Sequence, residues 1–208
     1  MLQDTSLGYF HHDNDYYNEM DRPYVDLWDT MRPAFGMNSS CETFYNNKHG
    51  CEQPGSNPAY TVGPEMIYEE KIFVDRCLEM VDDHPSSDVP FFLNYCSHIV
   101  HSPLQAPSTL YHTFDFMAND YDKHRQIYAS MVAYLDEGVG KIVDALTGSQ
   151  MWEDTLWFCQ SDNGGPSFTG DNHTANNWPL RGAKYSKCAP LPCQLLLWFP
   201  PICRTTRP

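Results

Sequence analysis

The residues best suited to chemistry lie between Asp162 and Lys184. Asp162 and Asn163 directly follow an apolar run, Thr155 to Cys159, which has the length and the β-branched and aromatic content of a buried strand. Both residues would therefore stand at the carboxyl end of a strand, where ligands bind in open α/β sheets. A carboxylate and an amide carbonyl are hard oxygen donors that suit Ca²⁺ or Mg²⁺. The sequence thus predicts a divalent-cation site at Asp162 and Asn163.

Each of these residues also has a simpler interpretation. The segment Asp-Asn-Gly-Gly is a good turn by itself, because Asn and Gly tolerate left-handed backbone. Lys184 could be a solvated surface lysine. His101, which precedes Ser-Pro, could hydrogen-bond within a turn, and His98 competes with it for any catalytic role. The residues alone leave these interpretations open.

The elements that must position these residues alternate along the chain, as is typical of an α/β layer fold. Apolar residues at helical spacing predict a helix from Ile67 to about Asp83, and residues 89–96 have the composition of a short buried strand. A second helix is predicted from about Asp122 to Ser149, with its end marked by Gly148. Its apolar face carries Met131, Leu135, Val139, Ile142 and Leu146. Such a helix between two apolar strands favours a mainly parallel sheet.

Composition and charge narrow the class of protein. A chain of 208 residues with 41% hydrophobic and 19% charged residues indicates one globular domain or a large piece of one. Thirteen Lys and Arg against 27 Asp and Glu give a net charge of -14, which argues against nucleic acid as a partner. There is no run of about 20 apolar residues that would span a membrane. The first residues, MLQDTSLGYFHHDND, lack the pattern of a signal peptide.

The cysteines and two sequons fit an oxidising, secretory environment. Cys41 and Cys51 bracket a short polar loop, so we expect a local disulfide between them in such a compartment. Asn38 and Asn172 begin Asn-x-Ser/Thr sequons. Three other cysteines lie in apolar segments and are expected to be small buried hydrophobes: Cys77, Cys96 and Cys159.

Three segments together resemble the central part of the type I sulfatases, and within them the arylsulfatase B-like branch. They are PFFLNYCSHIVHSPLQAP, YASMVAYLDEGVGKIVDAL, and SDNGG followed by NNWPLRGAKYSK, in the family's order and spacing over roughly residues 3 to 187. The resemblance implies an alkaline-phosphatase-like α/β fold, with a mixed, mainly parallel sheet flanked by helices and incomplete at both ends. It divides the chain into a partial catalytic domain, 1–187, and a divergent tail rich in Pro and Cys, 188–208.

The resemblance also implies roles for individual residues. Asp162 and Asn163 match the family's second pair of metal ligands, usually for Ca²⁺, and Lys184 matches a lysine that contacts the sulfate. His101, in the VHSPLQ segment, matches a histidine that binds sulfate near the leaving-group oxygen, which favours it over His98. A cation and a lysine would neutralise the sulfuryl oxygens, and an imidazole can donate a proton. The implied reaction is Ca²⁺-dependent hydrolysis of a sulfated sugar or an aryl sulfate ester.

The implied site has a geometric consequence. If the chain keeps the family fold, the Asp162 carboxylate, the His101 ring and the Lys184 ammonium should fall within about 10 Å of one another, because one small ligand would fill the pocket. The family's proteins also suggest a secretory route, with a lysosomal or extracellular destination.

The sequence departs from the family in two places. The family's CxPSR segment, whose cysteine becomes the formylglycine nucleophile, does not occur in the 208 residues, so we expect this chain to be inactive. The alternatives are a metal-dependent phosphoesterase of the same superfamily and a non-catalytic truncated or pseudoenzyme product. After YSK the family continues with WEGG and another strand, whereas this chain continues with CAPLPCQLLLWFPPICRTTRP. Residues 195–199 of that tail have no obvious partner strand.

Overall fold

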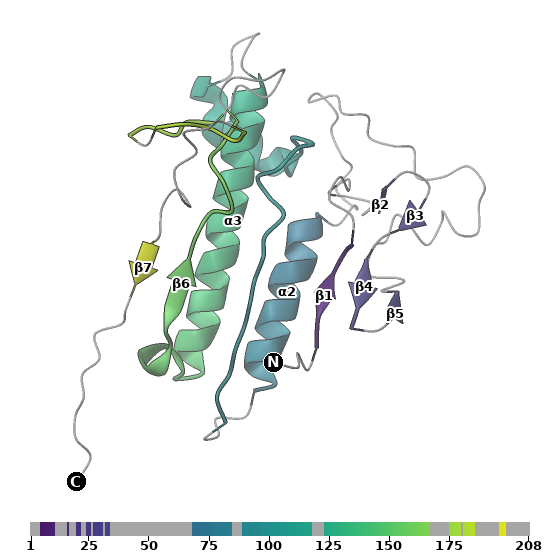
Figure 1. Cartoon of the computed structure of the whole chain (residues 1–208), viewed down its shortest axis with the longest axis vertical. Coiled ribbons are helices and arrows are strands. Elements are labelled where there is room, and N and C mark those ends of the chain that lie inside the picture. Colours follow the sequence, from purple (N-terminus) through teal and green to yellow (C-terminus); the bar gives the residue numbers. More distant parts are fainter. Residues whose placement is uncertain are drawn as a thin grey trace. The chain divides into compact units, whose positions relative to one another are not determined.

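A computed structural model describes part of the chain (Figure 1). The chain divides into two compact units. The first unit comprises Met1–Met80 and Phe91–Ile142, and the second comprises Val81–Pro90 and Val143–Pro208. The described residues are 5–10, 16, 20–21, 24–25, 27–30, 32–33, 68–84, 89–117, 123–166, 175–179, 181–185 and 196–198.

Short antiparallel strands form the sheet portion of the first unit. One sheet has the strand order β1-β4-β5, and a separate pair joins β2 to β3. In the first sheet Leu7 pairs with Asp29 and Gly8 with Trp28. The strands are β1 (Leu7–Gly8), β2 (Met20–Asp21), β3 (Tyr24–Val25), β4 (Trp28–Asp29) and β5 (Arg32–Pro33).

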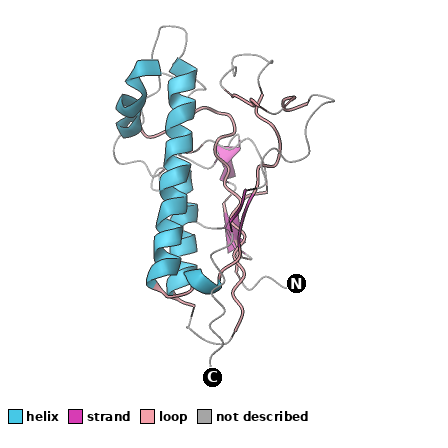
Figure 2. Cartoon of the chain, turned by 90° about the vertical axis from the view of Figure 1, so that its left-hand side faces the viewer, coloured by secondary structure: helices cyan, strands magenta, loops and turns pink. Residues whose placement is uncertain are grey.

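Two helices supply most of the regular structure, and both were predicted from their apolar spacing. Helix α2 spans Glu69–Asp82 and helix α3 spans Lys123–Gly148, which Figure 2 shows as the longest helix. A 3-10 helix, η1 (Ser108–Met117), precedes α3. On α3 the predicted positions Met131, Ile142 and Leu146 are buried, whereas Leu135 and Val139 are half-buried at the side of the stripe.

The end of α3 is closed by a glutamine and not by a glycine. Gly148 is the last helical residue, but the left-handed residue is Gln150, with φ 60°. The Gln150 amide donates to the Thr147 carbonyl at 3.1 Å, and the Met151 amide donates to the Leu146 carbonyl at 2.9 Å. These two bonds form a Schellman motif, which satisfies carbonyls that the helix end would leave unpaired.

The first unit contains two hydrophobic clusters. The first joins α3 to the segment before η1, and its buried members are Tyr16, Tyr68, Ile99, Ala106, Ile127 and Met131. In the second cluster, Leu27 packs with Ile72 and Phe73 of α2, and Tyr95 packs against it. The segment that runs from residue 91 to 106 therefore contacts both clusters, which fixes its position in the unit.

The predicted strand at residues 89–96 is wrong. This segment is extended, but it pairs with no strand among the described residues. From residue 91 onward its side chains alternate between half-buried and exposed, and Phe92 is 74% exposed whereas Tyr95 packs against the second cluster. This alternation is typical of an extended segment that is covered on one side only. The apolar run therefore does not mark a strand that is buried on both faces.

The described sheets also differ from the predicted parallel arrangement. In the second unit β6 (Trp157–Cys159) follows the 3-10 helix η2 (Trp152–Asp154) and pairs antiparallel with β7 (Leu196–Trp198). Every described strand pair is antiparallel. The prediction that residues 195–199 lack a partner is wrong, since Trp198 pairs with Trp157. Strand β6 is not buried either, because β7 is its one described neighbour and Phe158 is 53% exposed.

The cysteine predictions have mixed outcomes. Cys77 is buried, as expected, and burial raises the pKa of its thiol to about 11, so it stays protonated. The prediction is wrong for Cys96 and Cys159, which are exposed. Cys41 and Cys51, like the sequon residues Asn38 and Asn172, lie outside the described residues. In the part of the chain that is described, no helix has the length and apolar character needed to cross a membrane.

Two glycines of α3 should respond oppositely to alanine. A Cβ at Gly138 would lie 2.8 Å from Cγ2 of Val74 in α2, whereas a Cβ at the exposed Gly140 would meet nothing within 4 Å. We expect Gly140→Ala to raise the free energy of unfolding by about 0.5 to 1 kcal/mol. We expect Gly138→Ala to lower it by about 1 kcal/mol, since Val74 must move. Urea denaturation of both variants checks this, and equal shifts would contradict the packing of α2 against α3 at this point.

Candidate functional site

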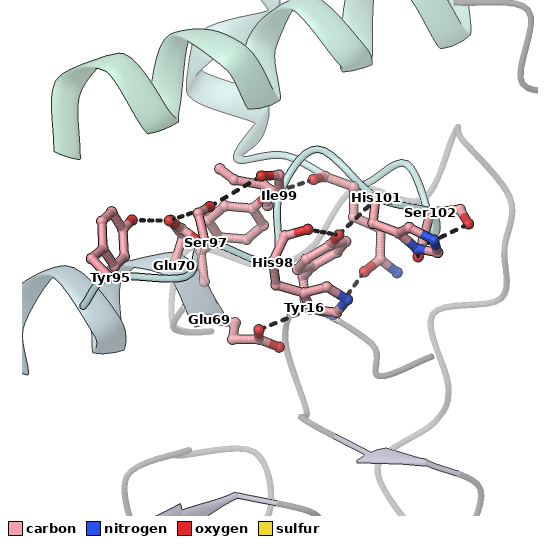
Figure 3. A network of polar contacts seen from close by, with 11 residues as sticks. Tyr16, Glu69, Glu70, Tyr95, Ser97, His98, Ile99, His101 and Ser102 are labelled. Carbon is pink, nitrogen blue, oxygen red and sulfur yellow. Dashed lines mark hydrogen bonds and ion pairs between the residues drawn. The ribbon is translucent and has the colours of Figure 1, made fainter. Parts of the chain in front are cut away.

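In the first unit, His101 stands on a turn that a buried tyrosine holds in place (Figure 3). The His101 amide donates to the His98 carbonyl at 3.2 Å and closes the turn. The Tyr16 hydroxyl donates to the His101 carbonyl at 2.7 Å and to the His98 carbonyl at 3.3 Å. Tyr16 is completely buried, so these bonds are shielded from water. The backbone of His101 is thereby fixed by a residue far away in sequence.

Tyr16 is itself anchored on both sides of its backbone. Its amide donates to Oε1 of Gln105 at 3.0 Å, and its carbonyl accepts from the Glu69 amide at 2.7 Å. The neighbouring Tyr68 hydroxyl donates to the Gln105 carbonyl at 2.8 Å. The first residue of α2, the tyrosine and the loop that carries His101 therefore form one hydrogen-bonded network.

His98 is a buried partner of Glu69. Its Nδ1 lies 3.0 Å from Oε1 of Glu69, and the two side chains are 6% and 0% exposed. When Glu69 is ionised, Nδ1 must carry the proton, because a carboxylate only accepts hydrogen bonds. The His98 ring packs against Tyr16 with a centroid separation of 4.5 Å and against Tyr9 at 4.9 Å. His98 is therefore a buried residue whose side chain is held by Glu69 and the two tyrosine rings.

His101 presents a different nitrogen to its surroundings. Its Nδ1 lies 2.8 Å from the Ser102 carbonyl oxygen, and a carbonyl can only accept, so Nδ1 is the donor. Nε2 is then the nitrogen that can accept a proton or, when protonated, donate one to a ligand. His101 is half-buried, and its ring lies nearly parallel to that of His98 at 6.2 Å.

A second buried acid, Glu70, lies beside this network. It accepts hydrogen bonds from Oγ of Ser97 at 2.7 Å and from the Tyr95 hydroxyl. Burial raises the pKa of Glu70, and the charge of Glu69 adds to the effect, although the two hydroxyl donors oppose it. Neither acid was predicted as part of a site. The signal was available for Glu70, because it precedes Phe73 and Cys77 on the buried face of α2 at helical spacing.

Replacing Glu70 by glutamine should change how stability depends on pH. Because folding raises the pKa of Glu70, its contribution is fully present at low pH and is lost as pH rises through the raised value. We expect Glu70→Gln, which keeps an acceptor for Ser97 and Tyr95, to stabilise the protein above that pH, because the neutral amide carries no charge that burial penalises. Urea midpoints measured across the pH range check this. A variant with the same pH profile as the wild-type protein would contradict it.

In the second unit, the Asp162-Asn163-Gly164-Gly165 loop is bound to the segment that ends in Lys184. The Gly165 amide donates to Oδ1 of Asn177 at 2.8 Å, and Nδ2 of Asn177 donates to the Gly165 carbonyl at 2.8 Å. The Lys184 amide also donates to the Gly165 carbonyl, at 3.4 Å. The backbone of Lys184 thus adjoins the loop that carries the predicted cation ligands.

The glycines make this close approach possible. A Cβ at Gly165 would lie 2.3 Å from Cβ of Ala175, and one at Gly164 would lie 3.3 Å from Oδ1 of Asn177. Gly182, two residues before Lys184, has φ 104°, a conformation that residues with a side chain rarely adopt. The structure therefore explains why glycine stands at three positions of the segments SDNGG and WPLRGAK.

The predicted cation ligands have the right donor type but form a partial set. Asp162 is exposed and Asn163 is half-buried, and the Asn163 carbonyl accepts from Oγ of Ser161 at 2.7 Å. Their side chains offer hard oxygens, which suit Ca²⁺, but can supply only about three of the six to eight that it takes. Among the described residues, no group of three or more His, Cys, Asp or Glu side chains could hold a metal ion. The two residues therefore fit a cation that takes further ligands elsewhere.

Lys184 brings a positive charge to the segment that is bound to this loop. It is half-buried, and its Nζ lies 5.3 Å from the ring centroid of the exposed Tyr185. The structure places Lys184 in the same unit as Asp162 and Asn163, and places His101 in the other unit. The catalytic and binding roles of these four residues stay predictions.

Comparison with solved structures defines the class of fold. The chain is similar to the crystal structure of Ps i-CgsB in complex with k-i-k-neocarrahexaose, with a TM-score of 0.62 and 24% identity over 87% of this chain and 36% of that one. A second structure of Ps i-CgsB gives a TM-score of 0.61 and 24% identity over 86% of this chain and 35% of that one. The sulfatase-like α/β fold class predicted above is confirmed.

Sequence comparison then gives the family. The Sulfatase family model matches residues 1–204, and the chain belongs to the sulfatase family. It is 30% identical to Arylsulfatase J of Mus musculus over 149 residues, which is 67% of this chain and 23% of that protein. It is 26% identical to N-acetylgalactosamine-6-sulfatase of Canis lupus familiaris over 110 residues, 53% of this chain and 19% of that protein. The chain therefore spans about a fifth to a quarter of these relatives.

Proposed function

We propose that this chain provides part of the sulfate and cation site of a sulfuric ester hydrolase that uses Ca²⁺. The observation that carries the proposal is the bond between the Lys184 amide and the Gly165 carbonyl. It brings the lysine of WPLRGAK beside the loop of SDNGG, in a chain that belongs to the sulfatase family. The backbone of a lysine is thus beside a loop that carries two hard-oxygen ligands, and its ammonium group together with a divalent cation would suit a small anion.

Each residue then has a defined task. Asp162 and Asn163 would hold one side of Ca²⁺, which would neutralise charge on the sulfuryl oxygens together with Lys184. His101, with Nδ1 committed to the Ser102 carbonyl, has Nε2 to protonate the leaving-group oxygen. The proton must already be on Nε2, so this step requires the imidazolium form of His101.

The family's nucleophile is the hydrated aldehyde of formylglycine, which attacks sulfur. The 208 residues contain no CxPSR segment from which formylglycine could be made. We therefore propose that the chain as printed binds sulfate esters but does not turn them over, because the stabilising groups remain while the nucleophile does not.

The substrate is proposed as a sulfated sugar or an aryl sulfate ester. The names of the relatives support this: Arylsulfatase J, N-acetylgalactosamine-6-sulfatase, and choline-sulfatase of Rhizobium meliloti (strain 1021), to which the chain is 39% identical over 54 residues. The fold neighbour Ps i-CgsB was solved with a neocarrahexaose. A secretory route with a lysosomal or extracellular destination is part of the same proposal.

Titration with p-nitrophenyl sulfate in the presence of Ca²⁺ tests the proposal. We expect saturable chemical-shift changes without release of nitrophenol, and their loss in Lys184→Ala. Lys71→Ala is the matched control, because Lys71 is an exposed lysine of α2 that is paired with Asp75. If Lys184→Ala and Lys71→Ala bind alike, the proposed site is wrong, and steady release of nitrophenol by the wild-type chain would contradict the absence of turnover.

A further inference from the structure

We propose that Tyr16 is a positioning residue for His101, because its hydroxyl holds both ends of the turn on which His101 stands. The catalytic value of this clamp rests on the function proposed above, but the clamp itself is a property of the first unit. Neither the sequence motifs nor the resemblance assigned any role to Tyr16. The network is drawn in Figure 3.

The hydroxyl is placed where one group can control the whole turn. The His101 amide and the Tyr16 hydroxyl both donate to the His98 carbonyl, at 3.2 Å and 3.3 Å. The same hydroxyl donates to the His101 carbonyl at 2.7 Å, which is the shorter of its two bonds. A single buried donor thus ties the first and last residues of the turn together, in a position that water does not reach.

Tyr16 can act as a clamp because both its ring and its backbone are held by other parts of the unit. Its ring packs between His98 at 4.5 Å and Tyr68 at 5.8 Å, and its carbonyl accepts from the amide of Glu69, the first residue of α2. Its amide is bound to the side chain of Gln105. The position of the His101 turn is therefore fixed relative to the start of α2, because Tyr16 is hydrogen-bonded to both.

The hydroxyl keeps the proton that the clamp requires. Burial raises the pKa of Tyr16 well above its ordinary value, and the charges of Glu69, Tyr9 and Glu70 raise it further. A tyrosine that remains neutral is a donor, and the two carbonyls can only accept. The direction of both hydrogen bonds is therefore fixed at neutral and mildly acidic pH.

The clamp reaches the ring of His101 through one peptide group. The carbonyl that Tyr16 binds belongs to the peptide between His101 and Ser102, and the next carbonyl, that of Ser102, accepts from Nδ1 of His101. If the first peptide turns, the second carbonyl moves and the Nδ1 bond weakens. The Tyr16 hydroxyl thereby holds the neutral ring in the form with its proton on Nδ1, which leaves Nε2 as the atom for chemistry.

Nitrogen NMR of the histidine rings in the full chain tests this without any ligand. We expect neutral His101 in the wild-type protein to be mainly protonated on Nδ1, and Tyr16→Phe to shift it towards the Nε2-protonated form that a free imidazole in water prefers. Tyr68→Phe is the matched control, because it removes a buried hydroxyl of the same cluster that binds the Gln105 carbonyl. It should leave the His101 pattern unchanged. A merely structural role for Tyr16 would affect both variants alike or neither.

The remaining outcomes also decide the question. If Tyr16→Phe leaves the His101 nitrogen pattern of the wild type in place, the clamp does not exist. If that variant does not fold, the wild-type protein is still informative: a slowly exchanging Tyr16 hydroxyl proton should show scalar coupling across the hydrogen bond to the His101 carbonyl carbon, and a hydroxyl proton that exchanges freely with water overturns the proposal.

A separate arm adds p-nitrophenyl sulfate with Ca²⁺ to the wild-type chain. A His101 pattern that depends on Tyr16 in a chain that fails to bind the ester would keep the clamp and reject the proposed function. If the chain binds the ester but the His101 pattern is unchanged in Tyr16→Phe, the proposed function is kept and the clamp is rejected.

Discussion

Replacing Met131 by alanine is expected to lower the free energy of unfolding by about 2 to 5 kcal/mol. Met131 is 0% exposed and packs in the first hydrophobic cluster. Truncation removes the transfer free energy of its buried side chain and leaves a cavity that the surrounding rings fill only in part. Urea denaturation followed by circular dichroism measures the change.

The adjacent residue of α3 is the control for this prediction. Val132 is 43% exposed, so Val132→Ala should change the free energy of unfolding by no more than about 0.5 kcal/mol. The first cluster includes Tyr16, Ile99 and Ala106, so damage at Met131 should also reach the turn that carries His101. Equal losses in the two variants would show that α3 does not bury the face described here.

Replacing Gly165 by alanine is expected to cost about 2 to 3 kcal/mol of stability in the second unit. The new Cβ would lie 2.3 Å from Cβ of Ala175, a separation that side chains do not tolerate, so one of the two segments must move. That movement should break the paired hydrogen bonds between Gly165 and Asn177 and the bond from the Lys184 amide. Loss of amide protection at Gly165 and Lys184 in hydrogen exchange measures it.

Gly148 in the same unit is the matched control, because a Cβ there would meet nothing within 4 Å. Gly148→Ala should keep the amide protection of Gly165 and Lys184. Wild-type protection at both amides in Gly165→Ala would contradict the close approach of the 175–177 segment to this loop.

The helices were predictable because their signal is local. Met131, Ile142 and Leu146 recur on one face of α3 at the helical period, and the same holds for Phe73 and Cys77 of α2. The apolar run Thr155 to Cys159 correctly predicted strand β6. The pairing of the strands was not predictable, because an apolar run does not say which neighbours it will pair with. Residues 89–96 stay unpaired among the described residues, while β6 pairs with a tail segment that the resemblance to the family had set apart.

The candidate site was also predictable only where its signal is local in the sequence. Asp162, Asn163 and Lys184 were found because they lie in short motifs with recognisable spacing. The support of His101 was not found, because it depends on Tyr16, whose hydroxyl reaches across 85 positions in sequence to the His101 carbonyl. Glu69 was missed because acidic residues in the first turn of a helix usually face solvent and interact with the helix dipole, whereas this one is completely buried against His98.

The proposed site makes one demand that can be measured directly: His101 must lie close to a cation held by Asp162 and Asn163. Mn²⁺ accepts the same oxygen ligands as Ca²⁺, and its unpaired electrons broaden the NMR signals of nearby nuclei. Substoichiometric Mn²⁺ is therefore added to the full chain while the ring signals of its histidines are followed. Ca²⁺ is then added in excess as a competitor.

We predict that the His101 ring signals broaden selectively, that Ca²⁺ restores them, and that Asp162→Asn abolishes the effect. Asp154→Asn, which alters an exposed acid of η2 in the same unit, should leave the broadening in place. His101 signals that stay sharp while Mn²⁺ binds, or broadening that survives in Asp162→Asn, would contradict the assignment of these residues to one sulfate and cation site.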